Sequence, residues 1–142
     1  MMNTRSVTLF LGGFALSLAA VAAGLPAEHQ AGNVRYVTGG VSDEEATAFK
    51  QIKGEYPLAI ELVEKSAGHN AFTADANVKV FDASGNVVLD AKADGPFMLV
   101  RLAPGSYRVQ ATLNGRTVQS GLLQVGAGRS TQAMLAFPGE GR

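Results

Sequence analysis

From Gly54 onward, apolar side chains recur at every second position in short runs, and each run ends in a turn sequence. A two-residue period places alternate side chains on opposite faces, as in a β-strand with one buried face. About seven such runs at this spacing are typical of an antiparallel β-sandwich. The predicted strands are 56–65, 77–82, 87–92, 97–102, 106–113, 116–125 and 130–137. We therefore expect a mostly β fold built as such a sandwich.

The turns between these runs are carried by glycine, proline, asparagine and aspartate. They read DASGN at 82–86, DGP at 94–96, APGS at 103–106, NG at 114–115 and GAG at 126–128. Asn114-Gly115 predicts a two-residue type I′ hairpin, and Pro104-Gly105 predicts a type II turn. The 17 glycines of the chain are then explained by turns rather than by a phosphate-binding loop.

One short helix is predicted over 43–53, ahead of the strands. Ser42 can cap it, and Glu45 can bond back to the amide of the cap as in a capping box. Gly54 can adopt the left-handed conformation that ends a helix. Phe49 and Ile52 share a narrow apolar face, so we expect the helix to dock on the sandwich through them.

The first 23 residues resemble a secretory signal peptide. Arg5 precedes an uncharged stretch from Val7 to Val21 that is shorter than the roughly 20 apolar residues a membrane-spanning helix needs, and small residues follow it. We expect cleavage after Ala22 or Ala23 and a periplasmic location, with an uncleaved anchor as the alternative. The expected mature chain has a flexible leader at 24–41, one domain at 42–138 and a tail at 139–142.

Composition narrows the possible partners. Removing residues 1–23 removes one positive charge and leaves a net charge of about −1, which gives no attraction to nucleic acid or to an anionic membrane. No stable membrane insertion is expected once the signal is cleaved. The chain has no cysteine, so disulfides, thiolate metal sites and cysteine nucleophiles are excluded.

The segment from Asp94 to Ala111 reads D-G-x-F-x-L-x-x-L-x-P-G-x-Y-x-V-x-A. This pattern resembles the carboxypeptidase regulatory-like domain, and the likeness extends more weakly over 56–137. The stretches 36–62 and 77–97 are similar to small stand-alone exported proteins of proteobacteria that carry this domain. The resemblance implies a transthyretin-like or immunoglobulin-like sandwich of about seven strands. It implies no catalytic residues, because the domain itself is not the hydrolase in that family.

The same segment can be interpreted physically as a stable hairpin. Phe97 and Leu99 are expected to face inward after the turn at Asp94, and Leu102 and Val109 to lie in the core. Tyr107 follows the chain reversal, so it can bury its ring while its hydroxyl bonds to backbone at the edge of the sandwich.

Candidate metal ligands are few. His69 and Asp75 lie in one loop, and neither His29 nor His69 has a second histidine nearby, so no metal or cofactor is predicted. The acidic run at 43–45 is better explained by helix capping than by a cation site.

The remaining residue classes also give no catalytic site. No serine lies in a nucleophile elbow, and the glycines of 121–128 precede a strand rather than a helix. Glu61 and Glu64 are expected on opposite faces of a strand, while Asp90 and Asp94 flank a turn. The arginines are interpreted as a solvated exterior. They are Arg101, Arg108, Arg116 and Arg129.

These observations favour a protein that is not an enzyme. We expect a non-catalytic binding or interaction module that uses strand edges or loops, with an unknown envelope protein or small ligand as its partner. A structural or assembly subunit of the cell envelope is the alternative, and a hydrolase accessory protein is a weaker one.

Overall fold

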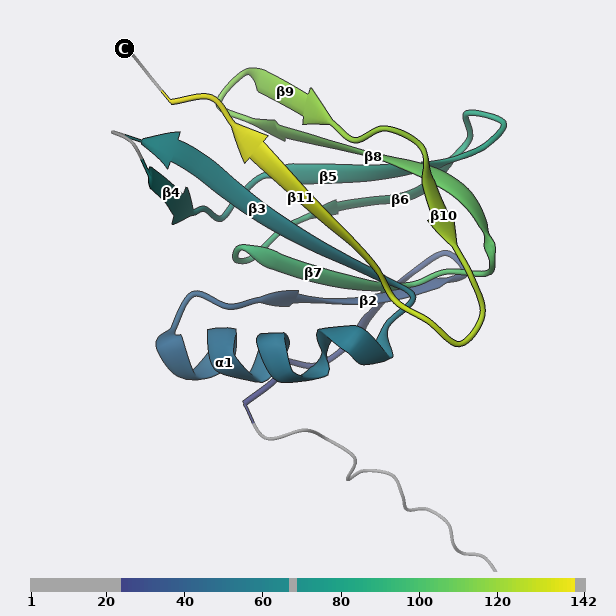
Figure 1. Cartoon of the computed structure of the whole chain (residues 1–142), viewed down its shortest axis with the longest axis horizontal. Coiled ribbons are helices and arrows are strands. Elements are labelled where there is room, and N and C mark those ends of the chain that lie inside the picture. Colours follow the sequence, from purple (N-terminus) through teal and green to yellow (C-terminus); the bar gives the residue numbers. More distant parts are fainter. Residues whose placement is uncertain (1–23, 67–68, 140–142) are drawn as a thin grey trace, which may run out of the picture.

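The structure is a computed structural model that describes residues 24–66 and 69–139, without the side chains of 66–72 (Figure 1). The predicted signal peptide at 1–23 and the last residues of the predicted tail lie outside the described residues. No helix within the described ranges has the length and apolar character needed to cross a bilayer.

Two sheets and one helix make up the described fold. The first sheet has the order β1 (His29–Ala31), β2 (Val34–Gly39), β7 (Phe97–Arg101), β3 (Leu58–Ser66) and β11 (Thr131–Phe137), with β4 (His69–Phe72) also paired to β3. The second has the order β10 (Leu123–Val125), β8 (Gly105–Leu113), β5 (Asn77–Asp82) and β6 (Val87–Lys92), with β9 (Arg116–Gln119) also paired to β8. Helix α1 (Asp43–Ile52) continues into a 3₁₀ turn, η2 (Lys53–Glu55).

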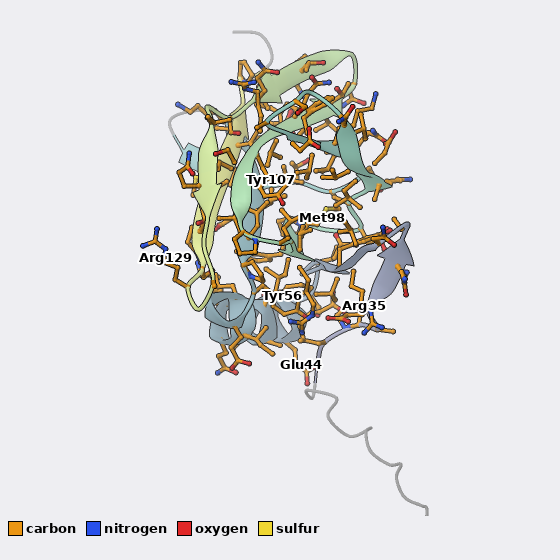
Figure 2. The ribbon with its side chains drawn as sticks, turned by 90° about the vertical axis from the view of Figure 1, so that its right-hand side faces the viewer. Arg35, Glu44, Tyr56, Met98, Tyr107 and Arg129 are labelled. Atoms are coloured by element: carbon orange, nitrogen blue, oxygen red, sulfur yellow. The ribbon has the colours of Figure 1, made fainter. Side chains whose placement is uncertain are left out.

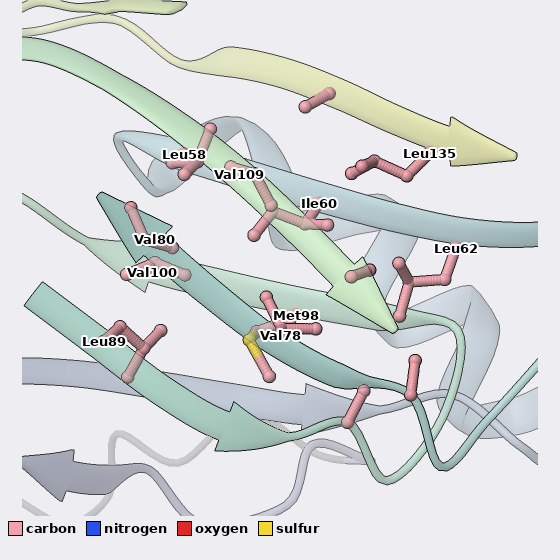
Figure 3. Close-up of a cluster of buried hydrophobic side chains, with 14 of the residues drawn as sticks. Leu58, Ile60, Leu62, Val78, Val80, Leu89, Met98, Val100, Val109 and Leu135 are labelled. Carbon is pink, nitrogen blue, oxygen red and sulfur yellow. The ribbon is translucent and has the colours of Figure 1, made fainter. Parts of the chain in front are cut away.

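The main core lies between the two sheets (Figure 3). Alternate side chains of β3, β5, β8 and β11 enter it, as the two-residue period predicts. In β3 these are Leu58, Ile60 and Leu62, all fully buried. Val80 of β5 and Val109 of β8 meet them from the second sheet. The expectation of a mostly β fold with one short helix is therefore confirmed.

Strand boundaries agree closely for β5 and β6, which match the predicted 77–82 and 87–92. The strand predicted at 116–125 is instead two strands, because register along β8 shifts by one residue between Gln119 and Leu123. Ser120 bridges the break, since its backbone N–H donates to Val109 O and its hydroxyl accepts from Val109 N. The antiparallel expectation is wrong at one pair, because β11 runs parallel to β3.

The prediction of a flexible leader over 24–41 is wrong for its central part. Residues 34–39 form β2, which pairs with β1 on one side and β7 on the other. Val37 is buried beneath α1. The hydroxyl of Thr38 is also buried and donates to Phe97 O at 2.8 Å while accepting from Asp94 N at 3.0 Å. These contacts place the segment inside the first sheet.

Helix α1 begins as predicted but ends differently. The Ser42 hydroxyl accepts from Glu45 N at 3.1 Å, which confirms the cap. The Glu45 carboxylate does not return to the cap amide; it accepts from Gly40 N at 2.7 Å instead. Gly54 is not left-handed, because the chain continues through η2. Phe49 is buried and Ile52 packs partly beside it, so the predicted docking face is confirmed.

Strand β7 is buried on both faces. Met98 and Val100 enter the core between the sheets, whereas Phe97 and Leu99 lie on the opposite face under α1. The sequence predicts that Phe97 and Leu99 face inward; they are buried, but by the helix. The Phe97 ring stacks on Phe49, with 5.5 Å between the centroids, and forms the centre of this second cluster.

Two turn predictions have different outcomes. Asn114 and Gly115 both have positive φ, at 51° and 79°, which confirms the predicted type I′ hairpin. Gly105 begins β8 without positive φ, so the predicted type II turn is wrong. The buried ring of Tyr107 and its hydroxyl bond to Ala103 O at 2.7 Å confirm the role predicted for this tyrosine.

Candidate functional site

A groove of about 340 Å³ runs along one flank of α1. One wall is formed by Ala46, Thr47 and Lys50 of the helix, and the other includes Thr73 and Ala74, which follow β4. Pro96, directly before β7, also lines the groove. The groove is therefore formed by three segments that are distant in the sequence: α1, residues 73–74 and Pro96.

The end of the groove near the start of α1 is fixed by a glycine joint, by which we mean the close contact between the backbones of Gly39 and Gly95. A Cβ on Gly95 would overlap the Gly39 carbonyl, so the two backbones pack directly against each other. Gly40 has a φ of 102° and donates its N–H to Glu45. The joint therefore holds the first turn of α1 against the turn at Asp94.

The groove is lined by apolar side chains and by polar groups that have no partner in the described part of the chain. Val41 lines it and is 72% exposed, although the residue before a helix cap commonly packs on the helix. The hydroxyls of Thr47 and Thr73 make no hydrogen bond with any residue of the described ranges. The N–H of Ala74 likewise has no backbone partner there. Apolar side chains and hydrogen-bonding groups therefore both line the groove.

A polar cluster surrounds Tyr56, which is labelled in Figure 2, and it includes Arg101 at the end of β7 away from the groove. The Tyr56 hydroxyl donates to Glu28 Oε2 at 2.7 Å, and Arg101 Nε donates to the same oxygen at 2.9 Å. Arg101 also lies over the Tyr56 ring, 4.2 Å from its centroid. These contacts tie the segment before β1 to β7 and to the residue that follows η2.

The cluster lowers the pKa of Glu28 and raises the pKa of Tyr56. Burial raises the pKa of Glu28, but the hydrogen bonds from Tyr56 and Arg101 and the charge of Arg101 outweigh burial and hold that pKa below its usual value. Burial, the hydrogen bond to Glu28 and the charge of Glu28 raise the pKa of Tyr56 to about 12. Glu28 is therefore ionised and Tyr56 protonated at neutral pH.

We expect the Glu28→Gln substitution to lower the free energy of unfolding by about 1–2 kcal/mol at pH 7, because it removes the charge from two hydrogen bonds of a carboxylate that is still 30% exposed. A lowered folded pKa gives stability that is present above the unfolded pKa of about 4.3 and lost as pH falls through the folded value. The difference from wild type should thus shrink below about pH 4. Urea unfolding from pH 7 to pH 3 measures it, and Glu55→Gln is the control. A constant difference would contradict the ionised role.

The candidate metal ligands weighed in the sequence can be followed only in part. The side chain of His69 lies outside the described residues, and Asp75 forms an exposed ion pair with Lys92 at 3.6 Å. His29 stacks on Tyr36 at 5.2 Å between ring centroids. No group of three or more potential ligands occurs among the residues that the structure describes.

The other residues singled out in the sequence are dispersed. Glu64 binds Arg116 at 2.8 Å, whereas Glu61 pairs in register with Met134 of β11. Asp90 accepts from Asn77 at 3.1 Å. The acidic run at 43–45 fills the first turn of α1, as expected. Arg101 and Arg108 belong to different sheets, and Arg129 lies in the turn between β10 and β11. The sequence predicts neither the groove nor the polar cluster.

No family model matches the chain, and no curated protein matches it.

Proposed function

We propose that the chain is an exported, non-catalytic binding module of the carboxypeptidase regulatory-like type that acts in the periplasm. The family proposal depends on the resemblance of 94–111, which includes the turn at the glycine joint. It is supported by two packed sheets and by Tyr107, whose hydroxyl returns to Ala103 O as in the tyrosine corner of immunoglobulin-like sandwiches. The proposal includes no catalytic step.

The groove along α1 carries the binding proposal. Its 340 Å³ lies near the lower end of the range for ligand pockets, about 300–1,000 Å³. A few residues of an extended chain fit this size. We propose that the occupant is a short extended peptide segment of an envelope protein.

The groups in the groove match an extended peptide. The N–H of Ala74, which has no partner among the described residues, can donate to a peptide carbonyl, as an exposed strand edge does when a peptide adds to it. The hydroxyls of Thr47 and Thr73 can donate to or accept from further backbone groups. Val41 and Ala46 then cover a small apolar side chain of the peptide.

A random peptide library displayed on phage tests this proposal against the immobilised mature protein. We expect enrichment of peptides that shift the NMR amide signals of Thr47 and Ala74 when they are synthesised and titrated. The Thr47→Arg substitution should lower their affinity at least about tenfold, because a long side chain on the helix wall fills the groove.

Gln51→Arg is the matched control, since Gln51 is also exposed on α1 but does not line the groove. Both variants place the same good helix former on the helix, so neither should alter folding. Enriched peptides that bind both variants equally, or no enrichment over an uncoated surface, would overturn the assignment of this groove.

A further inference from the structure

A second, smaller pocket of about 170 Å³ lies at β1 and β2 and shares no residue with the groove. It is lined by Glu28, His29, Gln30 and Arg35. Its volume is half that of the groove, so it suits a very small ligand or a single ionic group. The His29 ring is stacked on Tyr36, its partner in register, whereas Gln30 pairs in register with Arg35.

The positive charge at this pocket is not neutralised by contact. Arg35 is paired in register with Gln30 of β1 on one side and with Arg101 of β7 on the other, so the three side chains form a row across one face. Like charges directly opposite each other are unfavourable in a sheet. Arg101 is held by Glu28 and Tyr56, but Arg35 makes no hydrogen bond or ion pair with any residue of the described ranges.

Only one of the two carboxylate oxygens of Glu28 accepts hydrogen bonds from the described residues. Both hydrogen bonds to Glu28 end on Oε2, and within the described part of the chain Oε1 accepts none. Arg35 is close enough to influence Glu28 electrostatically, yet the two form no ion pair. The Gln30 amide donates to Gly32 O at 3.1 Å, which leaves its carbonyl oxygen to accept. The Glu28 carboxylate and the Arg35 guanidinium thus both line the pocket without forming an ion pair with each other.

We propose that this pocket binds a small zwitterion that carries an ammonium and a carboxylate group close together, as a free α-amino acid does. The ligand carboxylate binds the Arg35 guanidinium, and the ligand ammonium donates to Glu28 Oε1 and to the Gln30 carbonyl. Both contacts are charge-assisted hydrogen bonds, which are the strong ones. A ligand with one charge alone meets a group of like sign, so the pocket selects against it.

The test compares three probes by NMR titration of the mature protein: alanine, acetate and methylammonium. Alanine should shift the amide signals of Gln30 and Arg35 and saturate in the millimolar range, because the site is open to solvent. Acetate and methylammonium should bind at least about tenfold more weakly. Acetate binding as tightly as alanine would overturn the proposal in favour of a simple anion site, and the absence of any shift at Gln30 and Arg35 would overturn it entirely.

Variants separate binding from folding. Arg35→Gln should weaken alanine binding at least about tenfold, whereas Arg129→Gln, on the opposite side of the view in Figure 2, should leave it unchanged. Tyr56→Phe removes a hydrogen bond from Glu28 Oε2 but keeps the carboxylate, so alanine should still bind. Equal losses in Arg35→Gln and Arg129→Gln would contradict a specific site, as would retained binding in Arg35→Gln.

Discussion

The Gly95→Ala substitution is expected to lower the free energy of unfolding by about 3 kcal/mol, the upper end of the usual cost of overpacking. The added Cβ would overlap the carbonyl of Gly39, and backbone cannot rotate away as the end of a flexible side chain can. The strands on either side restrict any shift, because β2 and β7 are paired from Arg35 to Gly39. Because neither backbone can move away, we expect the added Cβ to strain the contact between Gly39 and Gly95.

Gly54→Ala is the matched control for this prediction. No atom lies within 4 Å of a Cβ at Gly54, and its φ is not positive. Replacing glycine where the backbone tolerates alanine is neutral or stabilises by about 0.4–1 kcal/mol. Urea unfolding of both variants measures the difference. A Gly95→Ala protein that unfolds at the wild-type midpoint would show that the two backbones are not in contact.

The sequence predicts well those elements whose character is set locally. Strands β5 and β6 have one buried face, so the alternation of Val78 and Val80 with polar neighbours identifies them. Helix α1 carries its own start signal at Ser42 and a narrow apolar face. These features depend on neighbours within a few residues along the chain.

Strand β2 has no clear sequence pattern because both of its faces are covered from Tyr36 onward. Tyr36 packs toward the main core and Val37 beneath α1, so no polar face alternates with an apolar one. The parallel pairing of β11 with β3 also has no local sign, because the direction of a partner strand depends on the path of the whole chain. The Glu45 carboxylate is a local exception: it accepts from Gly40 N, five residues earlier, instead of from the cap amide.

The groove could not be predicted because no motif marks it. Its residues come from three separate segments and are small or of common types, such as Ala46, Thr73 and Pro96. The polar cluster could not be predicted for a similar reason, because its residues also come from separate segments. Glu28 and Arg101 are 73 positions apart, and Tyr56 joins them from a third segment. Only the strand order of the first sheet brings these residues together.

The Phe97→Ala substitution is expected to cost about 3–5 kcal/mol, the range for removing a large buried aromatic side chain. Phe97 is 1% exposed and stacks on Phe49 with an angle of 8° between the rings. A helix of ten residues is marginal in isolation, so α1 depends on this contact for its position. The loss should therefore include faster amide exchange over Asp43–Ile52, beyond the change in global stability.

A double-mutant cycle with Phe49→Ala separates the stacking contact from burial. We expect a coupling energy of about 0.5–1.5 kcal/mol between the two rings, because Phe49→Ala already removes the partner that Phe97 contacts. Met134→Ala is the control. Met134 is 58% exposed on β11, so its truncation should change stability by no more than about 0.5 kcal/mol. Strictly additive costs for Phe49 and Phe97, with unchanged exchange in α1, would mean that the helix is held by other contacts, and the glycine joint between Gly39 and Gly95 would be the first to test.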